Sequence, residues 1–136
     1  MLPQQILLVE DDPLECQLAR RALSKIDPDI GVTHLADGQA LLDYLSESPA
    51  ESISLAIMDL NMPRRNGLAT LEYLREQGTQ PPFPIVMFSS SDDPDDVRRA
   101  YQLGAAAYVV KPVGGQQYRQ TMQRIVDFWL STNRIR

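Results

Sequence analysis

The chain has 136 residues, of which 43% are hydrophobic and 23% charged, the size and composition of one globular domain. Eighteen Asp and Glu against 13 Lys and Arg give a net charge of −5, which argues against a primary role in binding the nucleic-acid backbone. One cysteine, Cys16, excludes a disulfide scaffold and a cysteine-rich metal site. The chain has no signal-peptide pattern and no apolar stretch of the ~20 residues that a membrane span needs, so we expect a cytoplasmic protein with a single domain over residues 1–136.

The first predicted elements are a strand and the helix that follows it. Residues 6–9 form a continuous apolar run, typical of a strand buried on both faces, and three acids follow it. Asp12 is expected to cap a helix that has Pro13 at its first position, with Glu15 reaching back to the cap. The residues that recur at helical spacing, and so predict the buried face of this helix, are Leu14, Leu18, Ala22 and Ile26.

Strands and helices alternate along the rest of the chain, with a turn predicted at Asp37-Gly38. Further strands are predicted over residues 30–36, 53–58, 85–88 and 106–110. Further helices are predicted around residues 41–45, 68–74, 94–103 and 118–129. Five strands alternating with five helices indicate an α/β fold in which a doubly wound parallel sheet is covered by helices on both faces.

Polar residues follow four of the five predicted strands. Glu10 and Asp11 follow the first strand, Asp59 the third, Ser89 the fourth and Lys111 the fifth. Ligands of such sheets bind at the carboxyl ends of the strands, so these side chains are expected to converge. Carboxylates at close range repel one another unless a cation enters, and oxygen ligands suit Mg²⁺. A hydroxyl and an ammonium beside them suit the oxygens of a phosphoryl group.

With these residues the sequence resembles the receiver domain of two-component response regulators. The matching segments are Glu10-Asp11 after ILLV, Asp59 in MDLNMPRRNG, Ser89 in IVMFSSS and Lys111-Pro112 in AYVVKP, with Ser89 and Lys111 30 and 52 positions after Asp59. The likeness covers nearly the whole chain. It implies a flavodoxin-like fold with five strands in the order 2-1-3-4-5 and five helices, and it leaves no room for a separate output domain.

The resemblance also assigns roles in phosphorylation. Asp59 would be the phospho-acceptor, taking a phosphoryl group from the phosphohistidine of a sensor histidine kinase or of a phosphotransfer protein. Asp11, Asp59 and the backbone carbonyl of Asn61 would bind Mg²⁺, and Glu10 would act through a metal-bound water. The protein would then be no enzyme in the usual sense, with only self-phosphorylation and autodephosphorylation as its own chemistry.

Further residues would transmit the signal. Lys111 and Ser89 would contact phosphoryl oxygens, and the aromatic Tyr108 would follow Ser89 inward. The resemblance implies a cis bond before Pro112, although an X-Pro bond is cis only about 5% of the time in general. The switch would alter the surface of the fourth helix, fifth strand and fifth helix, which would bind a downstream protein or a second copy of the chain. No direct contact with nucleic acid or membrane is expected.

A second likeness concerns the stand-alone receivers associated with phytochrome-type histidine kinases. It rests on two segments, Asp37-Gly38-Gln39 with Leu42-Asp43-Tyr44-Leu45, and Asp127-Phe128-Trp129-Leu130. Trp129 and Phe128 otherwise read as packing residues of the last helix. His34, the only histidine, is expected to be a half-buried strand residue rather than a metal ligand.

Three other functions remain to be weighed against a phospho-accepting switch. A pseudo-receiver would act as a protein-interaction module without phosphorylation, but the four residues that this chemistry needs, Asp11, Asp59, Ser89 and Lys111, are all present. A phosphotransferase or hydrolase of the aspartyl-phosphate type would need a capping insertion, for which the loops are too short. A flavodoxin-like cofactor binder would need a glycine-rich phosphate loop where this chain has three acids, which would repel a phosphate.

Overall fold

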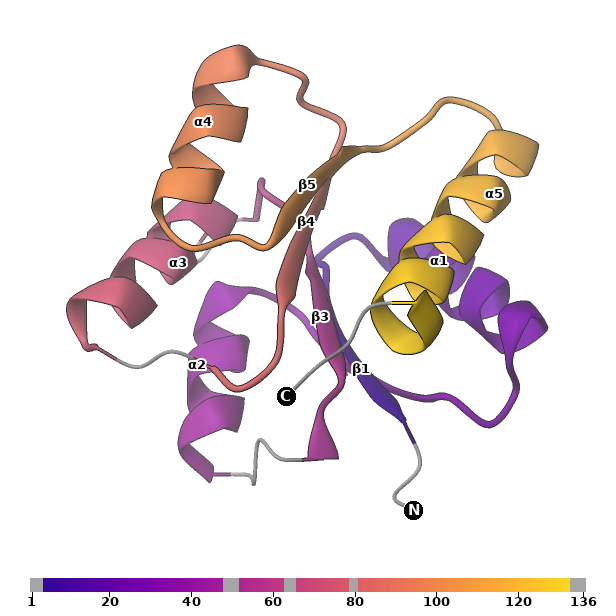
Figure 1. The fold of residues 1–136 in the computed structure, drawn as a ribbon, viewed down its shortest axis with the longest axis horizontal. Helices are drawn as coiled ribbons and strands as arrows, with labels where there is room; N and C mark the ends of the chain where they lie inside the picture. Colours follow the sequence, from indigo (N-terminus) through magenta and orange to yellow (C-terminus); the bar gives the residue numbers. More distant parts are fainter. Residues whose placement is uncertain (1–3, 48–51, 63–65, 79–80, 133–136) are drawn as a thin grey trace.

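Five parallel strands form the central sheet in a computed structural model that describes residues 4–47, 52–62, 66–78 and 81–132. Figure 1 shows how the helices surround this sheet. The strands are β1 (Gln5–Val9), β2 (Gly31–Leu35), β3 (Leu55–Met58), β4 (Ile85–Ser89) and β5 (Ala107–Val110). They lie in the order β2-β1-β3-β4-β5, and every neighbouring pair is parallel. The predicted fold class and strand order are confirmed. Residues 63–65 of the motif after Asp59 lie outside the described residues.

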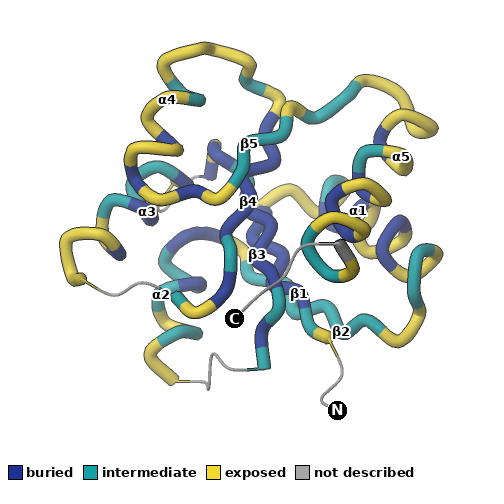
Figure 2. Tube along the Cα trace, in the orientation of Figure 1, coloured by how far each residue is buried: buried dark blue, intermediate teal, exposed yellow. Residues whose placement is uncertain are grey.

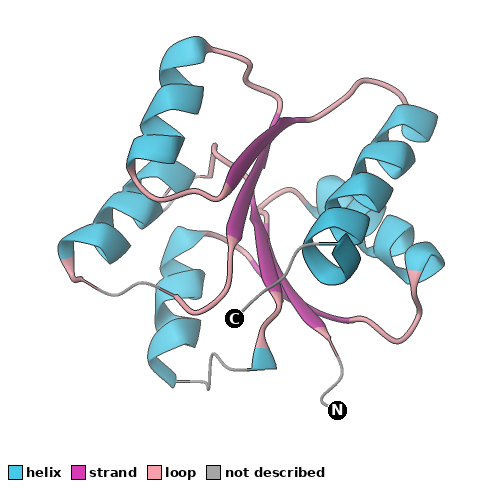
Figure 3. Ribbon diagram, in the orientation of Figure 1, coloured by secondary structure: helices cyan, strands magenta, loops and turns pink. Residues whose placement is uncertain are grey.

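Helices cover both faces of this sheet. They are α1 (Pro13–Ile26), α2 (Gly38–Glu47), α3 (Gly67–Glu76), α4 (Pro94–Gln102) and α5 (Gly115–Val126), with a π-helical segment η2 (Asp127–Thr132) continuing α5. Helices α1 and α5 lie on one face, and α2, α3 and α4 on the other (Figures 1 and 3). Within the described part of the chain, every helix is too short or too polar to cross a bilayer.

The core consists of two apolar clusters, one on each face of the sheet. Successive strand residues point to opposite faces, so Leu7 and Val9 pack with α2, α3 and α4, whereas Ile6 and Leu8 pack with α1 and α5. Figure 2 shows the strands as the buried centre, with the exposed residues on the helices and loops. This double burial explains why the strands read as continuous apolar runs in the sequence.

The buried face of α1 differs from the predicted one. Leu14 and Leu18 are 71% and 47% exposed, and the residues that pack on the sheet are Cys16, Ala19, Ala22 and Leu23. Small side chains at positions 16 and 19 let this helix lie close to the sheet. The prediction chose the stripe with the larger apolar residues, and it was wrong for its first two members.

The start of α2 is capped by a side chain, and the last helix packs on the sheet through one stripe of residues. Gly38 begins α2 rather than forming a turn, because the Asp37 carboxylate accepts the N–H of Ala40 at 2.9 Å. The last helix is found where it was predicted, and its buried residues are Tyr118, Met122, Ile125 and Val126. Trp129 packs against this cluster, whereas Phe128 is 49% exposed.

Candidate functional site

The carboxyl ends of β1 and β3 bring three acids together. These strands are direct neighbours, and the pairing continues one residue further, where the N–H of Asp59 donates to the carbonyl of Val9 at 3.0 Å. Carboxylate oxygens of Glu10, Asp11 and Asp59 all lie within 4.8 Å of one another. The predicted convergence of these three side chains is therefore confirmed.

Glu10 is the most buried of the three acids. Its Oε1 accepts from Lys111 Nζ at 2.9 Å, and its Oε2 accepts the N–H groups of Asp11 at 3.0 Å and Asp12 at 3.4 Å. Burial raises the pKa of Glu10 to about 7, and the charge of Asp59 adds to this shift, whereas the Lys111 hydrogen bond opposes it. The side chain is therefore partly protonated near neutral pH unless a cation joins the site.

Asp59 is held by backbone donors from the loop that follows it. The N–H of Leu60 donates to Asp59 Oδ1 at 2.8 Å, and the N–H of Asn61 also stabilises the carboxylate. Burial raises the pKa of Asp59, and the positive charge of Lys111 is the strongest opposing influence. The Asp59 carboxylate also lines a small cavity together with Glu10, Glu15 and Lys111.

Lys111 supplies the positive charge of the site. Its Nζ lies 2.9 Å from Glu10, 3.3 Å from Glu15 and 3.8 Å from Asp59. Burial alone would lower the pKa of Lys111, but the hydrogen bond to Glu10 and the charges of the nearby carboxylates outweigh it and raise this pKa. One ammonium thus faces three carboxylates, with Asp11 a fourth acid nearby, and the site favours a further cation.

Ser89 and Tyr108 are linked through the loop after β4. Ser89 is fully buried, and its Oγ accepts the N–H of Ser91 at 3.2 Å. The hydroxyl of Tyr108 donates to the carbonyl of the same Ser91 at 2.8 Å. On α4, the phenol oxygen of Tyr101 accepts the N–H of Tyr108 at 3.0 Å. A change at Ser89 can therefore reach β5 and α4 through one loop residue.

A model of the response regulator receiver domain matches residues 6–123 of this chain. The chain belongs to this family. Receiver domains are signalling parts of two-component systems rather than a family of enzymes, and the function of this chain is that of a response-regulator receiver.

Three proteins that are similar to this receiver domain indicate which kind of response regulator it resembles. FilR2 of Methanothrix harundinacea, a probable methanogenesis regulatory protein, is 32% identical over 97% of this chain and 87% of its own length. The crystal structure of the phosphorylated cyanobacterial phytochrome response regulator RcpA has a TM-score of 0.87 and is 30% identical over 96% of both chains. The Mn²⁺-bound form of the response regulator Rcp1 has a TM-score of 0.86 and is 28% identical over 98% of this chain and 99% of its own. The likeness to phytochrome-associated response regulators is thus confirmed.

The acids of this receiver domain fit a divalent cation. Their donor atoms are carboxylate oxygens, the ligand type that Mg²⁺ and Mn²⁺ prefer, and they are close enough to share one ion. Among the residues that the structure describes, Lys111 pairs with these acids, and its single charge leaves the carboxylates only partly neutralised.

The predicted cis bond before Pro112 is wrong. Among the residues that the structure describes there is no cis peptide bond, so the bond between Lys111 and Pro112 is trans, the isomer that X-Pro bonds prefer in general. The N–H of Lys111 continues the strand pairing by donating to the carbonyl of Ser89 at 2.7 Å.

Sequence reasoning missed two contacts of this receiver site. Glu15 pairs with Lys111 instead of reaching back to the start of α1. The Nε2 of His34 lies 2.6 Å from the carbonyl oxygen of Glu10, and it must carry the proton because a carbonyl can only accept. His34 is half-buried, as predicted. Both contacts join elements far apart in the chain, and no local pattern indicates them.

Proposed function

We propose that Asp59 accepts a phosphoryl group from the phosphohistidine of a sensor histidine kinase or a phosphotransfer protein. The observation that carries this proposal is the convergence of Glu10, Asp11, Asp59 and Lys111 at one edge of the sheet. Asp11, Asp59 and the carbonyl of Asn61 would hold Mg²⁺, with Glu10 bound through a water. When bound, Mg²⁺ would neutralise charge on Asp59 and on the phosphoryl oxygens.

The transfer exchanges one bond of phosphorus for another. A bond forms between a carboxylate oxygen of Asp59 and phosphorus, the bond from phosphorus to the donor imidazole nitrogen breaks, and its electron pair stays on the imidazole. Lys111 needs only a small movement to pair with a phosphoryl oxygen, since its Nζ lies 3.8 Å from Asp59. Autodephosphorylation would return the carboxylate when water attacks phosphorus. These two reactions are the only chemistry that we propose for the chain itself.

Phosphorylation would be read through Ser89 and Tyr108. The Ser89 hydroxyl would turn to a phosphoryl oxygen and release the Ser91 N–H, which would move the loop that also holds the Tyr108 hydroxyl. Such a shift changes the balance between two existing conformations and alters the surface of α4, β5 and α5. A downstream protein that binds one of these conformations would receive the signal.

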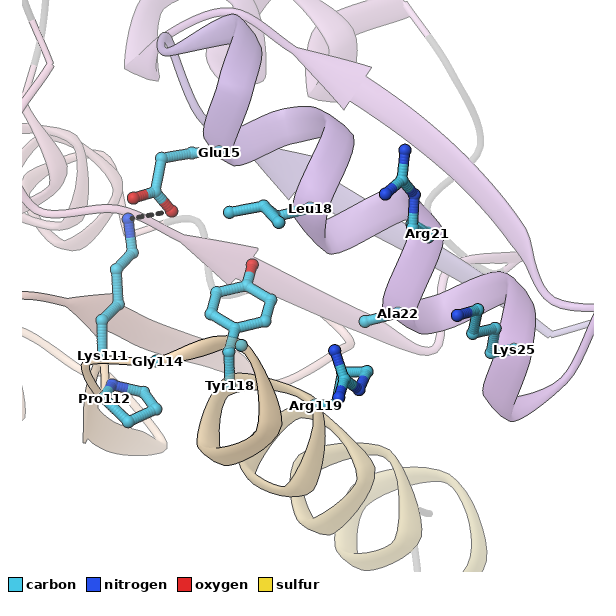
Figure 4. A pocket seen from close by; sticks show the side chains of 11 residues that line it. Glu15, Leu18, Arg21, Ala22, Lys25, Lys111, Pro112, Gly114, Tyr118 and Arg119 are labelled. Atoms are coloured by element: carbon cyan, nitrogen blue, oxygen red, sulfur yellow. Dashed lines mark ion pairs between the residues drawn. The ribbon is translucent and has the colours of Figure 1, made fainter.

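A groove beside the site suits a protein phosphodonor. It lies between α1 and α5, has a volume of about 350 Å³ and reaches from Lys111 to Lys25 (Figure 4). Its apolar wall includes Leu18 and Tyr118. The large exposed side chain of Val113, 95% accessible, stands just past Pro112 on the loop that leads to α5. We propose that Val113 and the apolar wall of this groove contact the donor protein.

The similar proteins suggest how this receiver would obtain its phosphoryl group and pass on the signal. The chain spans most of the length of FilR2 and RcpA, so we propose a stand-alone receiver over residues 1–136 whose output passes through protein contacts. RcpA is a phytochrome response regulator, which favours a phytochrome-type kinase as phosphodonor. The buried free thiol of Cys16 suits the reducing cytoplasm, where we place the protein.

The test is incubation with Mg²⁺ and acetyl phosphate, followed by mass spectrometry of the intact protein. We expect a gain of one phosphoryl group in the parent and none in Asp59→Asn. Asp29→Asn, an exposed aspartate at the opposite end of the sheet, is the matched control and should be modified like the parent. An unmodified parent would contradict the proposal and favour a pseudo-receiver, and modification of Asp59→Asn would contradict the assignment of Asp59.

A further inference from the structure

Glu15, on the first turn of α1, contacts the active-site ammonium although it belongs neither to the acid cluster nor to the helix cap. We propose that Glu15 is a positioning residue that holds Lys111 toward α1 and competes with the phosphoryl group for it. The inference rests on the proposed function of Asp59 and concerns how readily that site accepts its phosphodonor.

The geometry places Lys111 closer to Glu15 than to the acceptor. Its Nζ lies 3.3 Å from Glu15 Oε2, compared with 3.8 Å from Asp59 Oδ2. Figure 4 shows the Glu15 and Lys111 side chains meeting at the end of the groove between α1 and α5. In this arrangement the ammonium is drawn away from the point where phosphoryl oxygens arrive.

The first turn of α1 does not need Glu15 for its own hydrogen bonds. The Asp12 carboxylate accepts the N–H of Leu14 at 2.9 Å, and the N–H of Asp12 donates to Glu10 Oε2 at 3.4 Å. A glutamate at position 15 would ordinarily take the Asp12 N–H to complete a capping box. Because Glu10 takes that donor, the Glu15 side chain is available to Lys111.

Exposure decides which partner Lys111 gives up. An ammonium has three protons, of which one is donated to Glu10, whereas Glu15 and Asp59 are ion-pair partners at 3.3 and 3.8 Å. An incoming phosphoryl oxygen therefore competes with these carboxylates for the ammonium. The side chain of Glu15 is 33% exposed, compared with 6% for Glu10 and 14% for Asp59. Glu15 is therefore rehydrated most easily when it is released. It keeps the ammonium ordered before phosphorylation and yields it afterwards.

The experiment measures phosphorylation rate against acetyl phosphate concentration at saturating Mg²⁺. For Glu15→Gln we expect the half-saturating concentration to fall roughly two- to fivefold, the size expected of a partly exposed ion pair, with the maximal rate unchanged. Glu76→Gln removes the same charge from the far end of α3 and should match the parent. A merely structural role of Glu15 would lower the maximal rate rather than the half-saturating concentration.

Glu15→Asp separates contact with Lys111 from general repulsion of the anionic donor. Aspartate keeps the negative charge but is one methylene shorter, so it loses the contact with Lys111. We expect it to behave like Glu15→Gln. If Glu15→Asp behaves like the parent, repulsion explains the effect and the inference is wrong. If Glu15→Gln matches Glu76→Gln while the parent is phosphorylated, the inference alone fails. If the parent takes no phosphoryl group, both the proposed function and this inference are wrong.

Discussion

Glu10 has one carboxylate oxygen on Lys111 and the other on two backbone N–H groups, so a single side chain ties β5 to the start of α1. The sequence predicted that Glu10, Asp11, Asp59 and Lys111 would meet, because each follows a strand of one parallel sheet. It could not predict their individual hydrogen bonds. The contact between Lys111 and Glu10 joins residues 101 positions apart in the sequence. The distance between their side-chain atoms depends on the packing of the whole sheet.

The raised pKa of Glu10 predicts how stability depends on pH. The folded protein holds a proton on Glu10 up to a pH of about 7, whereas the unfolded chain releases it near the ordinary value of 4.5. Between these values the folded state binds more protons, so the free energy of unfolding falls as pH rises. We expect a loss of up to about 3 kcal/mol, which chemical denaturation at a series of pH values measures. The raised pKa of Asp59 acts in the same direction.

Glu10→Gln is the control for this pH dependence, because it cannot titrate and should make the profile less steep over the same range, leaving the contribution of Asp59. Mg²⁺ should oppose the loss, since it binds the deprotonated carboxylates. The increase in Tm on adding Mg²⁺ is therefore expected to be larger at pH 8 than at pH 6. A stability that rises between pH 5 and pH 7 would contradict the assignment.

At the scale of the elements, the strands and helices were predictable because their apolar periodicity is strong. The buried face of α1 was not predictable from periodicity. A stripe through Leu14 and Leu18 and a stripe through Cys16 and Ala19 both continue to Ala22 and Ile26, and only packing against the sheet selects the second. Nor does the periodicity indicate that the last helix ends in a π-helical segment. The start of α3 shows a similar dependence on packing, because it lies directly against the backbone at Asp59.

Gly67 makes this close approach of α3 possible. A Cβ atom built on Gly67 would lie 2.7 Å from the carbonyl oxygen of Asp59 and 2.6 Å from Met87 Cε, and the N–H of Gly67 donates to Leu60 at 2.7 Å. In Gly67→Ala the helix must move away from this backbone, which should cost about 1–3 kcal/mol of unfolding free energy. Because Asp59 would move with the loop, phosphorylation by acetyl phosphate should also slow. Denaturation curves and the phosphorylation rate measure the two effects.

Gly115→Ala is the matched control, since Gly115 also begins a helix but its Cβ would meet only the end of the Arg119 side chain at 3.4 Å. This variant should keep the parent's phosphorylation rate and be no less stable. Equal loss of stability in both variants would show that the glycine at a helix start matters, rather than the contact with Asp59.

For the whole molecule, the order of the strands is what makes the site. Strand β1 lies between β2 and β3, so the chain reverses direction across the sheet beside β1, and the acids of β1 and β3 become neighbours. Apolar periodicity alone indicates five strands but not their order, which came from the resemblance to receiver domains. The net charge of −5 is likewise unevenly placed, because several of the acids gather at one edge of the sheet.

The protein is expected to form a dimer when a phosphoryl mimic occupies the site. Strand β5 pairs on one side only, and the surface of α4, β5 and α5 carries two large exposed hydrophobic side chains among its described residues, Tyr101 at 49% and Val110 at 43%. We expect Mg²⁺ with beryllofluoride, a phosphoryl mimic, to convert the protein to a dimer through this face, as sedimentation velocity would show. Val110→Glu should keep it monomeric, because a dimer would bury two like charges together. Leu14→Glu, the same kind of change at an exposed position on α1, should leave the dimer intact. A protein that stays monomeric with beryllofluoride would contradict the prediction.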